Sequence, residues 1–550
     1  MEKQLEELRE NRIKKISSLD FFVLIILLII IFDLEIFGIY GETFFRDFSI
    51  IFEGGYRITQ FQIPYQDFFI PMGPVVFYMQ AFFNSILGTN LFSMAMHAFV
   101  LAAILSVFFY FILRREFNYF MSFIFTIFLF LSFNGFTFYP FYNTTPYFFF
   151  FLNIFLLFAH RKKDSLPKSL LFLTAVLVTL SFYSKQDTGL LHPIFILFYF
   201  SFNYKKQWKS IFLYYILPLL IFIIGTYLLL SNITGFAYWF NLGQSPHNSR
   251  FLNLFSARSI WGIVTSWKFY ITLFLFFAYL YYIFTKKKND YSIDILFKTN
   301  NSRRLVTIFL IIAAITLISQ STSGLTNNSF SMGDPVLIFI LFILIKENTD
   351  FLKYQKKIII VYFLIVILLL SINPFAVYGQ VLLNYKNEDL GRVSSGCYSG
   401  ILMPKASLEG LNIIKNTIEK YGKPDFFSMT EYSFLYCDYN ISPPKGIPLW
   451  FDEDVSFFKE NIPDIMNSID SLSPKVILVQ DAHRKGTRNM AAEFEEKFIS
   501  SGYTRTAIVD APASYQKTYY SLGYTKTDIV KIEKTTAPII ILVRNDLLNN

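Results

Sequence analysis

The chain has 550 residues, of which 54% are hydrophobic and 20% aromatic, with 68 Phe and a mean hydropathy of +0.43. This composition excludes an ordinary soluble globular protein and is typical of a chain that crosses a membrane many times. The formal net charge of +9 is divided among short basic clusters between apolar runs, which argues against a nucleic-acid partner and instead indicates membrane topology.

The first apolar run, at 19–39, follows a charged, helix-like stretch at 2–15 and precedes no small-residue cleavage site. We therefore expect a retained anchor and not a signal peptide. Asp33 and Glu35 lie near the far end of this run. A carboxylate at membrane depth is a candidate functional group by default, because the bilayer penalises it unless it faces a partner, a wet cavity or a substrate.

Residues two apart on a continuous helix point to opposite sides, so Asp33 and Glu35 cannot share one pocket unless the helix ends between them. Gly38 and Gly41 are close enough to end it. We favour Asp33 over Glu35 as the functional acid. The alternative is that one acid merely ends the span and meets Arg46 or water.

Reading the basic clusters as cytoplasmic predicts about eleven spans, an N-terminus inside (1–18) and a C-terminal region outside. The apolar piece at 75–87 is placed as an interfacial or re-entrant helix, because a full span there would move every later basic loop to the other side. The predicted spans are 19–39, 91–113, 119–133, 147–160, 169–183, 189–203, 211–231, 268–285, 305–320, 335–347 and 358–374.

The first outer loop, at 40–90, is rich in polar and turn-forming residues. Asp67 could bind an acceptor or hold this loop, and a turn-forming or helix-capping role explains it equally well. Gly73 and Pro74 are interpreted as a turn into the interfacial helix.

Cations are scarce on the predicted outer face, and an anionic ligand there would need them. Lys185 lies in a polar break between two spans, where a snorkelling lysine is the alternative interpretation. Trp239 and Trp261 could stack on a ligand or, as is commoner for Trp at this depth, lie at the lipid headgroups. The candidate cations are Arg46, Lys185, Arg250, Arg258 and Lys268.

From about residue 377 the composition becomes that of a globular protein. Strand-like and helix-like segments alternate over 377–550, which predicts one small α/β domain. Cys397 and Cys437 both fall in this domain; a disulfide and two buried free thiols both remain open. The five histidines show no metal-ligand spacing, so a zinc site built from His is not expected.

The first span and loop resemble the start of the GT-C superfamily of membrane glycosyltransferases, which use polyprenyl-phosphate-linked sugars and include the protein O-mannosyltransferases and the aminoarabinose transferases. The similarity lies in the acid of the 32–38 segment and in the Pro-Tyr-x-Asp-Phe and Gly-Pro of residues 64–74. A second likeness covers 432–450, where Pro443 and Pro444 follow a short helix-like segment. Lys185 and Gln186 also look like a Lys-Gln pair in bacterial relatives.

This resemblance implies an α-helical polytopic membrane protein with a transmembrane glycosyltransferase domain at 19–376 and an extracytoplasmic α/β domain at 377–550. The implied reaction is an inverting transfer of a sugar from a polyprenyl-phosphate donor to an extracytoplasmic lipid, glycan or protein, in a plasma (bacterial inner) membrane. Asp33 and Glu35 would be the catalytic candidates, with Asp33 favoured as the general base for the acceptor hydroxyl.

Asp67, Arg46, Lys185, Gln186, Arg250 and Arg258 would bind substrate. The metal ligands are unknown, and a divalent cation (Mg²⁺ or Mn²⁺), if one binds, would be held by carboxylates and phosphate oxygens. Two alternatives remain: a transporter or flippase for lipid-linked sugars, and a surface polysaccharide ligase or polymerase.

Overall fold

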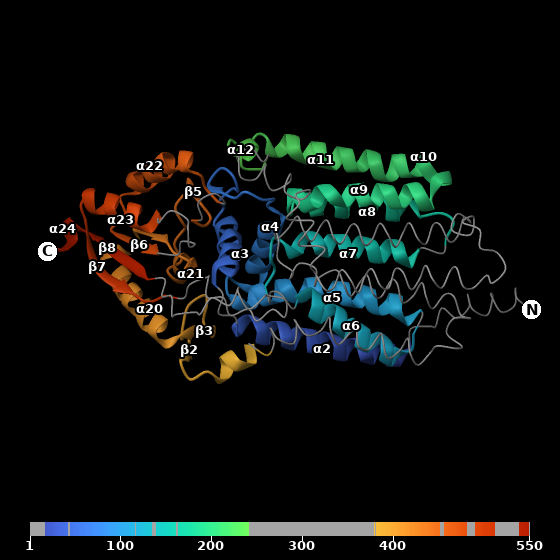
Figure 1. The fold of residues 1–550 in the computed structure, drawn as a ribbon, viewed down its shortest axis with the longest axis horizontal. Coiled ribbons are helices and arrows are strands. Elements are labelled where there is room, and N and C mark those ends of the chain that lie inside the picture. Colours follow the sequence, from blue (N-terminus) through green and yellow to red (C-terminus); the bar gives the residue numbers. More distant parts are fainter. Residues whose placement is uncertain are drawn as a thin grey trace, which may run out of the picture.

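A computed structural model of the full chain describes a helical bundle joined at one end to an α/β domain (Figure 1). The described residues are 17–41, 45–115, 117–134, 139–160, 163–240, 379, 381–451, 456–480, 490–511 and 538–548. The predicted spans at 268–285, 305–320, 335–347 and 358–374 lie outside them.

The bundle consists of long apolar helices whose axes run roughly along the length of the molecule (Figure 1). α2 packs on α5 and α6, α5 also contacts α7, and α8 contacts α7, α9 and α11. The helices are α2 (Ser18–Tyr40), α5 (Leu91–Arg114), α6 (Tyr119–Asn134), α7 (Thr144–Ala159), α8 (Lys168–Phe182), α9 (Gln186–Asn203), α10 (Trp208–Ile211) and α11 (Leu217–Leu230).

Three helical runs in the described part are long and apolar enough to cross a membrane: Ser18–Tyr40, Leu91–Arg114 and Lys205–Leu230. The last of these joins η1 (Lys205–Gln207), α10, η2 (Phe212–Ile216) and α11. Each predicted span within the described residues corresponds to a helix.

A cluster of charged groups at the N-terminal end of α2 shows how the bundle accommodates a buried carboxylate. Asp20 forms a capping box with Ser17 and accepts hydrogen bonds from Arg114 and Tyr110 of α5. Asp20 is 4% exposed, so its charge is paired where it is buried.

Two shorter helices, α3 (Phe45–Thr59) and α4 (Val75–Leu87), lie across the end of the bundle, between it and the α/β domain (Figure 1). Gly54 allows the two helices to approach closely, because a Cβ at this position would lie 2.2 Å from the ring of Phe77. α4 buries polar Gln80 and Asn84 and exposes Tyr78, Phe82 and Ile86. An outward apolar face on a short helix agrees with the predicted interfacial placement.

The C-terminal domain contains a four-stranded sheet with the order β4-β6-β8-β7. β6 pairs parallel with β4 and antiparallel with β8, and β7 pairs antiparallel with β8. The strands are β4 (Phe426–Met429), β6 (Val476–Gln480), β7 (Tyr503–Val509) and β8 (Ile539–Arg544). This mixed sheet confirms the predicted α/β class.

Helices and short strands complete the domain. The helices are α20 (Lys405–Thr417), η3 (Ile418–Gly422), α21 (Phe434–Asp438), η4 (Lys459–Asn461), α22 (Ile462–Leu472), α23 (Met490–Ser500) and α24 (Asn545–Leu548), and the remaining strand pair is β2 (Leu390–Arg392) with β3 (Leu402–Pro404).

The first loop and the C-terminal domain share one hydrophobic core and one pair of strands. β1 (Phe68–Phe69) pairs parallel with β5 (Ile447–Pro448), although these strands are distant in sequence. The shared core includes Phe48, Phe52 and Tyr398, whose rings make edge contacts. We call this contact region of α3, the loop at 60–74 and the segment at 441–449 the junction.

Candidate functional site

The two acids of α2 point in opposite directions. The helix continues without a break to Tyr40, so the predicted separation of Asp33 and Glu35 is confirmed. Glu35 is 0% exposed and lies on the buried face with Leu27 and Ile31, whereas Asp33 is exposed. Of the two carboxylates, only that of Asp33 therefore lies at the surface of the described structure.

Asp67 stabilises the 60–74 loop. Its Oδ2 accepts the backbone N–H of Ile63 at 2.9 Å, which closes a turn, and its Oδ1 lies 3.2 Å from Nζ of Lys445. Its backbone carbonyl accepts the N–H of Gly446 at 2.8 Å. The turn-forming and loop-holding interpretations both describe this geometry, in which the Asp67 side chain is 9% exposed.

The turn between α8 and α9 contacts the same loop. Gly73 packs so tightly there that a Cβ would lie 1.8 Å from the carbonyl oxygen of Tyr183, and the N–H of Val75 donates to that oxygen at 3.2 Å. Only glycine fits at residue 73 without moving one of the two backbones. Gly73 and Pro74 thus form the predicted turn into α4, with Pro74 at its N-cap position.

Lys185 and Gln186 occupy the α8–α9 turn, as the sequence indicated. Lys185 is half-buried, precedes α9 at its N-cap position and donates from Nζ to Oδ1 of Asn143 at 2.7 Å. Gln186 is 7% exposed and donates from Nε2 to the carbonyls of Pro71 and Phe240, at 3.2 and 3.1 Å. Gln186 therefore joins the loop to α12 (Phe236–Phe240), while Lys185 is the better placed of the two for an anion.

Trp239 does not take either of the roles considered for it. It belongs to α12, is 3% exposed and stacks on Phe69 of β1 with ring centroids 5.0 Å apart. Its ring fills the space beside the junction, because the loop brings an aromatic residue against it. Neither a sugar nor a lipid headgroup can reach this face of the indole in the present structure.

Arg46 lies in the first turn of α3, and only its backbone is described. Arg250, Arg258, Lys268 and Trp261 lie outside the described residues. Lys185 is therefore the candidate phosphate-binding cation whose side-chain contacts are established. The described residues contain no group of three or more His, Cys, Asp or Glu that could hold a metal ion.

Asp33 and Lys185 belong to different parts of the bundle. α2 packs on α5 and α6, whereas the turn that carries Lys185 joins α8 to α9, next to α7 (Figure 1). The structure groups Asp67, Lys185 and Gln186 around the 60–74 loop, whereas Asp33 lies on α2.

Glu53 and Arg57 of α3 form a buried ion pair that was not predicted from the sequence. Nη2 of Arg57 lies 2.6 Å from Oε1 of Glu53, and the two side chains are 1% and 8% exposed. Burial raises the pKa of Glu53, and the charge of Arg57 acts in the opposite direction. The spacing of four residues within an amphipathic helix was the available signal.

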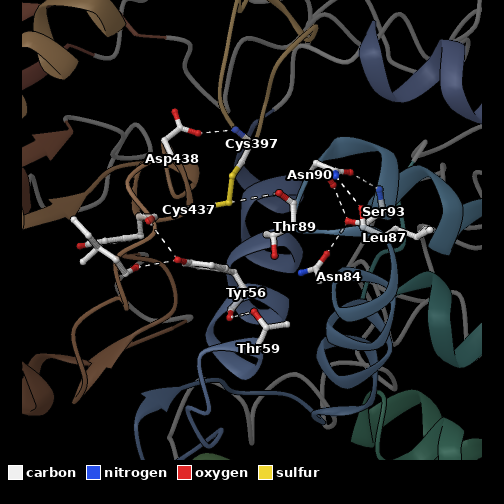
Figure 2. The surroundings of a disulfide bond; sticks show 12 residues. Tyr56, Thr59, Asn84, Leu87, Thr89, Asn90, Ser93, Cys397, Cys437 and Asp438 are labelled. Atoms are coloured by element: carbon white, nitrogen blue, oxygen red, sulfur yellow. Dashed lines mark hydrogen bonds between the residues drawn. A yellow bond between two sulfur atoms is a disulfide. The ribbon is translucent and has the colours of Figure 1, made fainter.

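Cys397 and Cys437 form a disulfide, which settles the alternative that the sequence left open (Figure 2). The bond lies against the turn between α4 and α5, where Cys437 Sγ is 3.6 Å from the carbonyl oxygen of Thr89 and the N–H of Leu91 donates to the carbonyl of Cys397. Asp438 accepts the N–H of Cys397 at 2.6 Å. The disulfide therefore links two segments of the C-terminal domain at the place where this domain meets the bundle.

Comparisons with known proteins agree with this architecture. Residues 71–230, from the turn that precedes α4 to the end of α11, match a family described as dolichyl-phosphate-mannose-protein mannosyltransferase. No curated protein sequence matches the chain.

Two solved structures of ArnT from Cupriavidus metallidurans share the fold. The apo state has 9% identity and a TM-score of 0.52, and covers 96% of this chain and 99% of its own. The state bound to undecaprenyl phosphate has 8% identity and a TM-score of 0.50, and covers 96% and 98%. At such identities the likeness concerns the fold alone. The partial family match and the shared fold are both in line with the sequence resemblance to the GT-C membrane glycosyltransferases.

Proposed function

We propose that this protein transfers a sugar from a polyprenyl-phosphate donor to an acceptor on the extracytoplasmic side of the membrane. The observation that carries the proposal is the fold shared over 96% of the chain with an ArnT structure that holds undecaprenyl phosphate. The half-buried Lys185 at the end of α8 supports it, because an ammonium group suits a lipid phosphate.

The proposed chemistry is a single displacement with inversion. The acceptor oxygen attacks the anomeric carbon while its proton passes to a carboxylate, and the bond from that carbon to the phosphate oxygen breaks, so the lipid phosphate leaves with the electron pair. General base catalysis of this kind contributes about 10²- to 10⁴-fold. We assign the base to Asp33, because its carboxylate is exposed and that of Glu35 is not. This assignment requires α2 and the α8–α9 turn to line one substrate cavity, since the base and the phosphate-binding cation act on the same anomeric centre.

Cations would stabilise the phosphate that leaves. We assign this role to Lys185 and, by sequence, to Arg46, Arg250 and Arg258. A divalent cation, if the donor brings one, would be held by phosphate oxygens and carboxylates, and removal of divalent ions with EDTA tests that requirement.

The topology proposed from the basic clusters puts the C-terminal domain outside the membrane. The disulfide supports this orientation, because such bonds persist in oxidising compartments. A reporter fused to the C-terminus would have to be inaccessible from the cytoplasm.

The test is to incubate the purified protein with polyprenyl-phosphate sugars and acceptors and to measure release of polyprenyl phosphate. Asp33→Asn should bind donor normally and lose turnover by about 10²-fold or more, whereas Asp164→Asn, at an exposed loop between α7 and α8, should be fully active. An Asp33→Asn variant with undiminished turnover would remove Asp33 as the base. A wild-type protein that binds no donor would overturn the proposal itself.

A further inference from the structure

Arg57 connects three separate segments at the junction. It lies in the last turn of α3 and is 1% exposed. Its guanidinium donates to Oε1 of Glu53 at 2.8 Å, to Oε1 of Gln62 at 3.0 Å and to the backbone carbonyl of Pro444 at 2.7 Å. These partners belong to α3, to the 60–74 loop and to the C-terminal domain.

A buried guanidinium is tolerated only when its charge is paired and its donors are satisfied. Glu53 supplies the charge, and the fork shape of Arg57 supplies donors in several fixed directions. A lysine would keep the charge but could not reproduce this planar set of hydrogen bonds. The ring of Phe68, 5.6 Å from the guanidinium carbon, covers a further side.

The same segment of the C-terminal domain is held by two further side chains. Gln62 donates from Nε2 to Ser442 and to the carbonyl of Pro443, and Tyr56 donates its hydroxyl to the carbonyl of Ile441 at 3.1 Å. Residues 441–444 therefore meet α3 and the loop through consecutive polar contacts. The β1–β5 pairing continues this contact.

The opposite edge of the loop rests on the turn that carries Lys185. Gly73 lies against the backbone of Tyr183, and Gln186 holds the carbonyl of Pro71. The loop is thus fixed at one edge by Arg57 and the C-terminal domain, and at the other by the α8–α9 turn. A shift at the first edge must move the second, because this close contact leaves no space to absorb it.

We propose that Arg57 is a positioning residue through which the C-terminal domain sets the place of the 60–74 loop against Lys185, and so the affinity for the lipid phosphate. This rests on the proposed function for its ligand, but it concerns how the site is held and not which bond is made. Arg57 itself touches no substrate.

The principal variant is Arg57→Lys, with Arg392→Lys as the matched control. Arg392 is an exposed arginine of β2, whose guanidinium lies over Tyr385 and away from the loop. Gln62→Ala tests the same contact without changing the buried charge. Three measurements apply to each full-length protein: thermal midpoint, amide hydrogen exchange at Gly446 and Leu449, and Kd for undecaprenyl phosphate.

We expect Arg57→Lys and Gln62→Ala to remain folded while Gly446 and Leu449, which donate to Asp67 and Phe69, exchange faster. The Kd for undecaprenyl phosphate should rise about 10-fold or more, and turnover should fall by up to about 10²-fold, as small misplacements do. The double variant should lose little beyond the worse single variant, because both side chains hold one segment. Arg392→Lys should match wild type.

A folded Arg57→Lys protein with the wild-type Kd would overturn the proposal. The proposal would also fail if the apparent Kd of Arg57→Lys and of Gln62→Ala rose only as far as the unfolded fraction of each protein explains. If the wild type binds undecaprenyl phosphate but transfers no sugar, the proposed function fails and the Kd values still decide the role of Arg57. If it binds no undecaprenyl phosphate, both fail.

Discussion

Asp67 and Lys445 form an ion pair across the junction, with Oδ1 and Nζ 3.2 Å apart, although one residue precedes α4 and the other follows α21. The lysine side chain is 66% exposed and that of the aspartate only 9%. The other carboxylate oxygen of Asp67 closes the turn at Ile63. One side chain thus shapes the loop and contacts the C-terminal domain.

These contacts separate two possible roles of Asp67. Asp67→Asn keeps an acceptor for the N–H of Ile63 and loses only the exposed ion pair, so we expect it to lower the free energy of unfolding by less than about 1 kcal/mol. Asp67→Ala also loses the turn, which costs about 1 kcal/mol more. Denaturation of both variants beside wild type measures the difference. If Asp67→Asn folds normally and yet loses activity, the charge of Asp67 acts on a substrate.

Lys185 should respond to changes in both charge and length. Lys185→Met keeps the apolar stem and removes the ammonium, so donor affinity should fall by about 10-fold or more, the effect of losing one hydrogen bond to a charged group. Lys185→Arg should retain part of the donor affinity, because the positive charge remains. Titration of each variant with undecaprenyl phosphate gives the comparison.

Asn143→Ala serves as the control for the support that Asn143 gives to Lys185. It should lose less affinity than Lys185→Met, since the ammonium stays near the site. If Lys185→Met and the wild type bind undecaprenyl phosphate with equal affinity, Lys185 does not bind the phosphate and is a snorkelling lysine.

The apolar helices were predictable because their signal is local. The predicted span at 91–113 corresponds to Leu91–Arg114, and the strand-like pattern predicted within 377–550 includes the strand Val476–Gln480. Long apolar runs and short β-branched runs each specify one type of element. The polar edge strand Tyr503–Val509 was missed because its outward residues dilute this pattern.

The junction could not be predicted, since it depends on contacts between residues far apart in the chain. No local pattern pairs Phe68 with Ile447, or directs Arg57 to Pro444. Similarly, helix periodicity separated Asp33 from Glu35 but could not say which of them faced the interior. That choice depends on where α5 packs.

Removal of the disulfide should destabilise the C-terminal domain. Cys397 and Cys437 are 40 residues apart, and a crosslink over such a loop typically contributes about 2–4 kcal/mol. The double variant Cys397→Ser/Cys437→Ser should therefore unfold at a lower temperature. A reducing agent should lower the midpoint of the wild type but not that of the variant, because the chain has only two cysteines. Identical midpoints for all samples would contradict a stabilising disulfide.

Asp438 should make stability depend on pH. Burial raises the pKa of its carboxyl, and burial outweighs the opposing effects of Lys415, whose Nζ is 2.6 Å away, and of the N–H of Cys397. A carboxyl with a higher pKa in the folded than in the unfolded protein binds its proton more tightly when folded. Its contribution to stability is therefore complete below the unfolded value near 3.8 and is lost as the pH rises through the folded value. Asp438→Asn should lack this decline, and thermal midpoints of both proteins between pH 4 and 7 measure it. Parallel pH profiles for the two proteins would show that Lys415 keeps the carboxylate charged throughout.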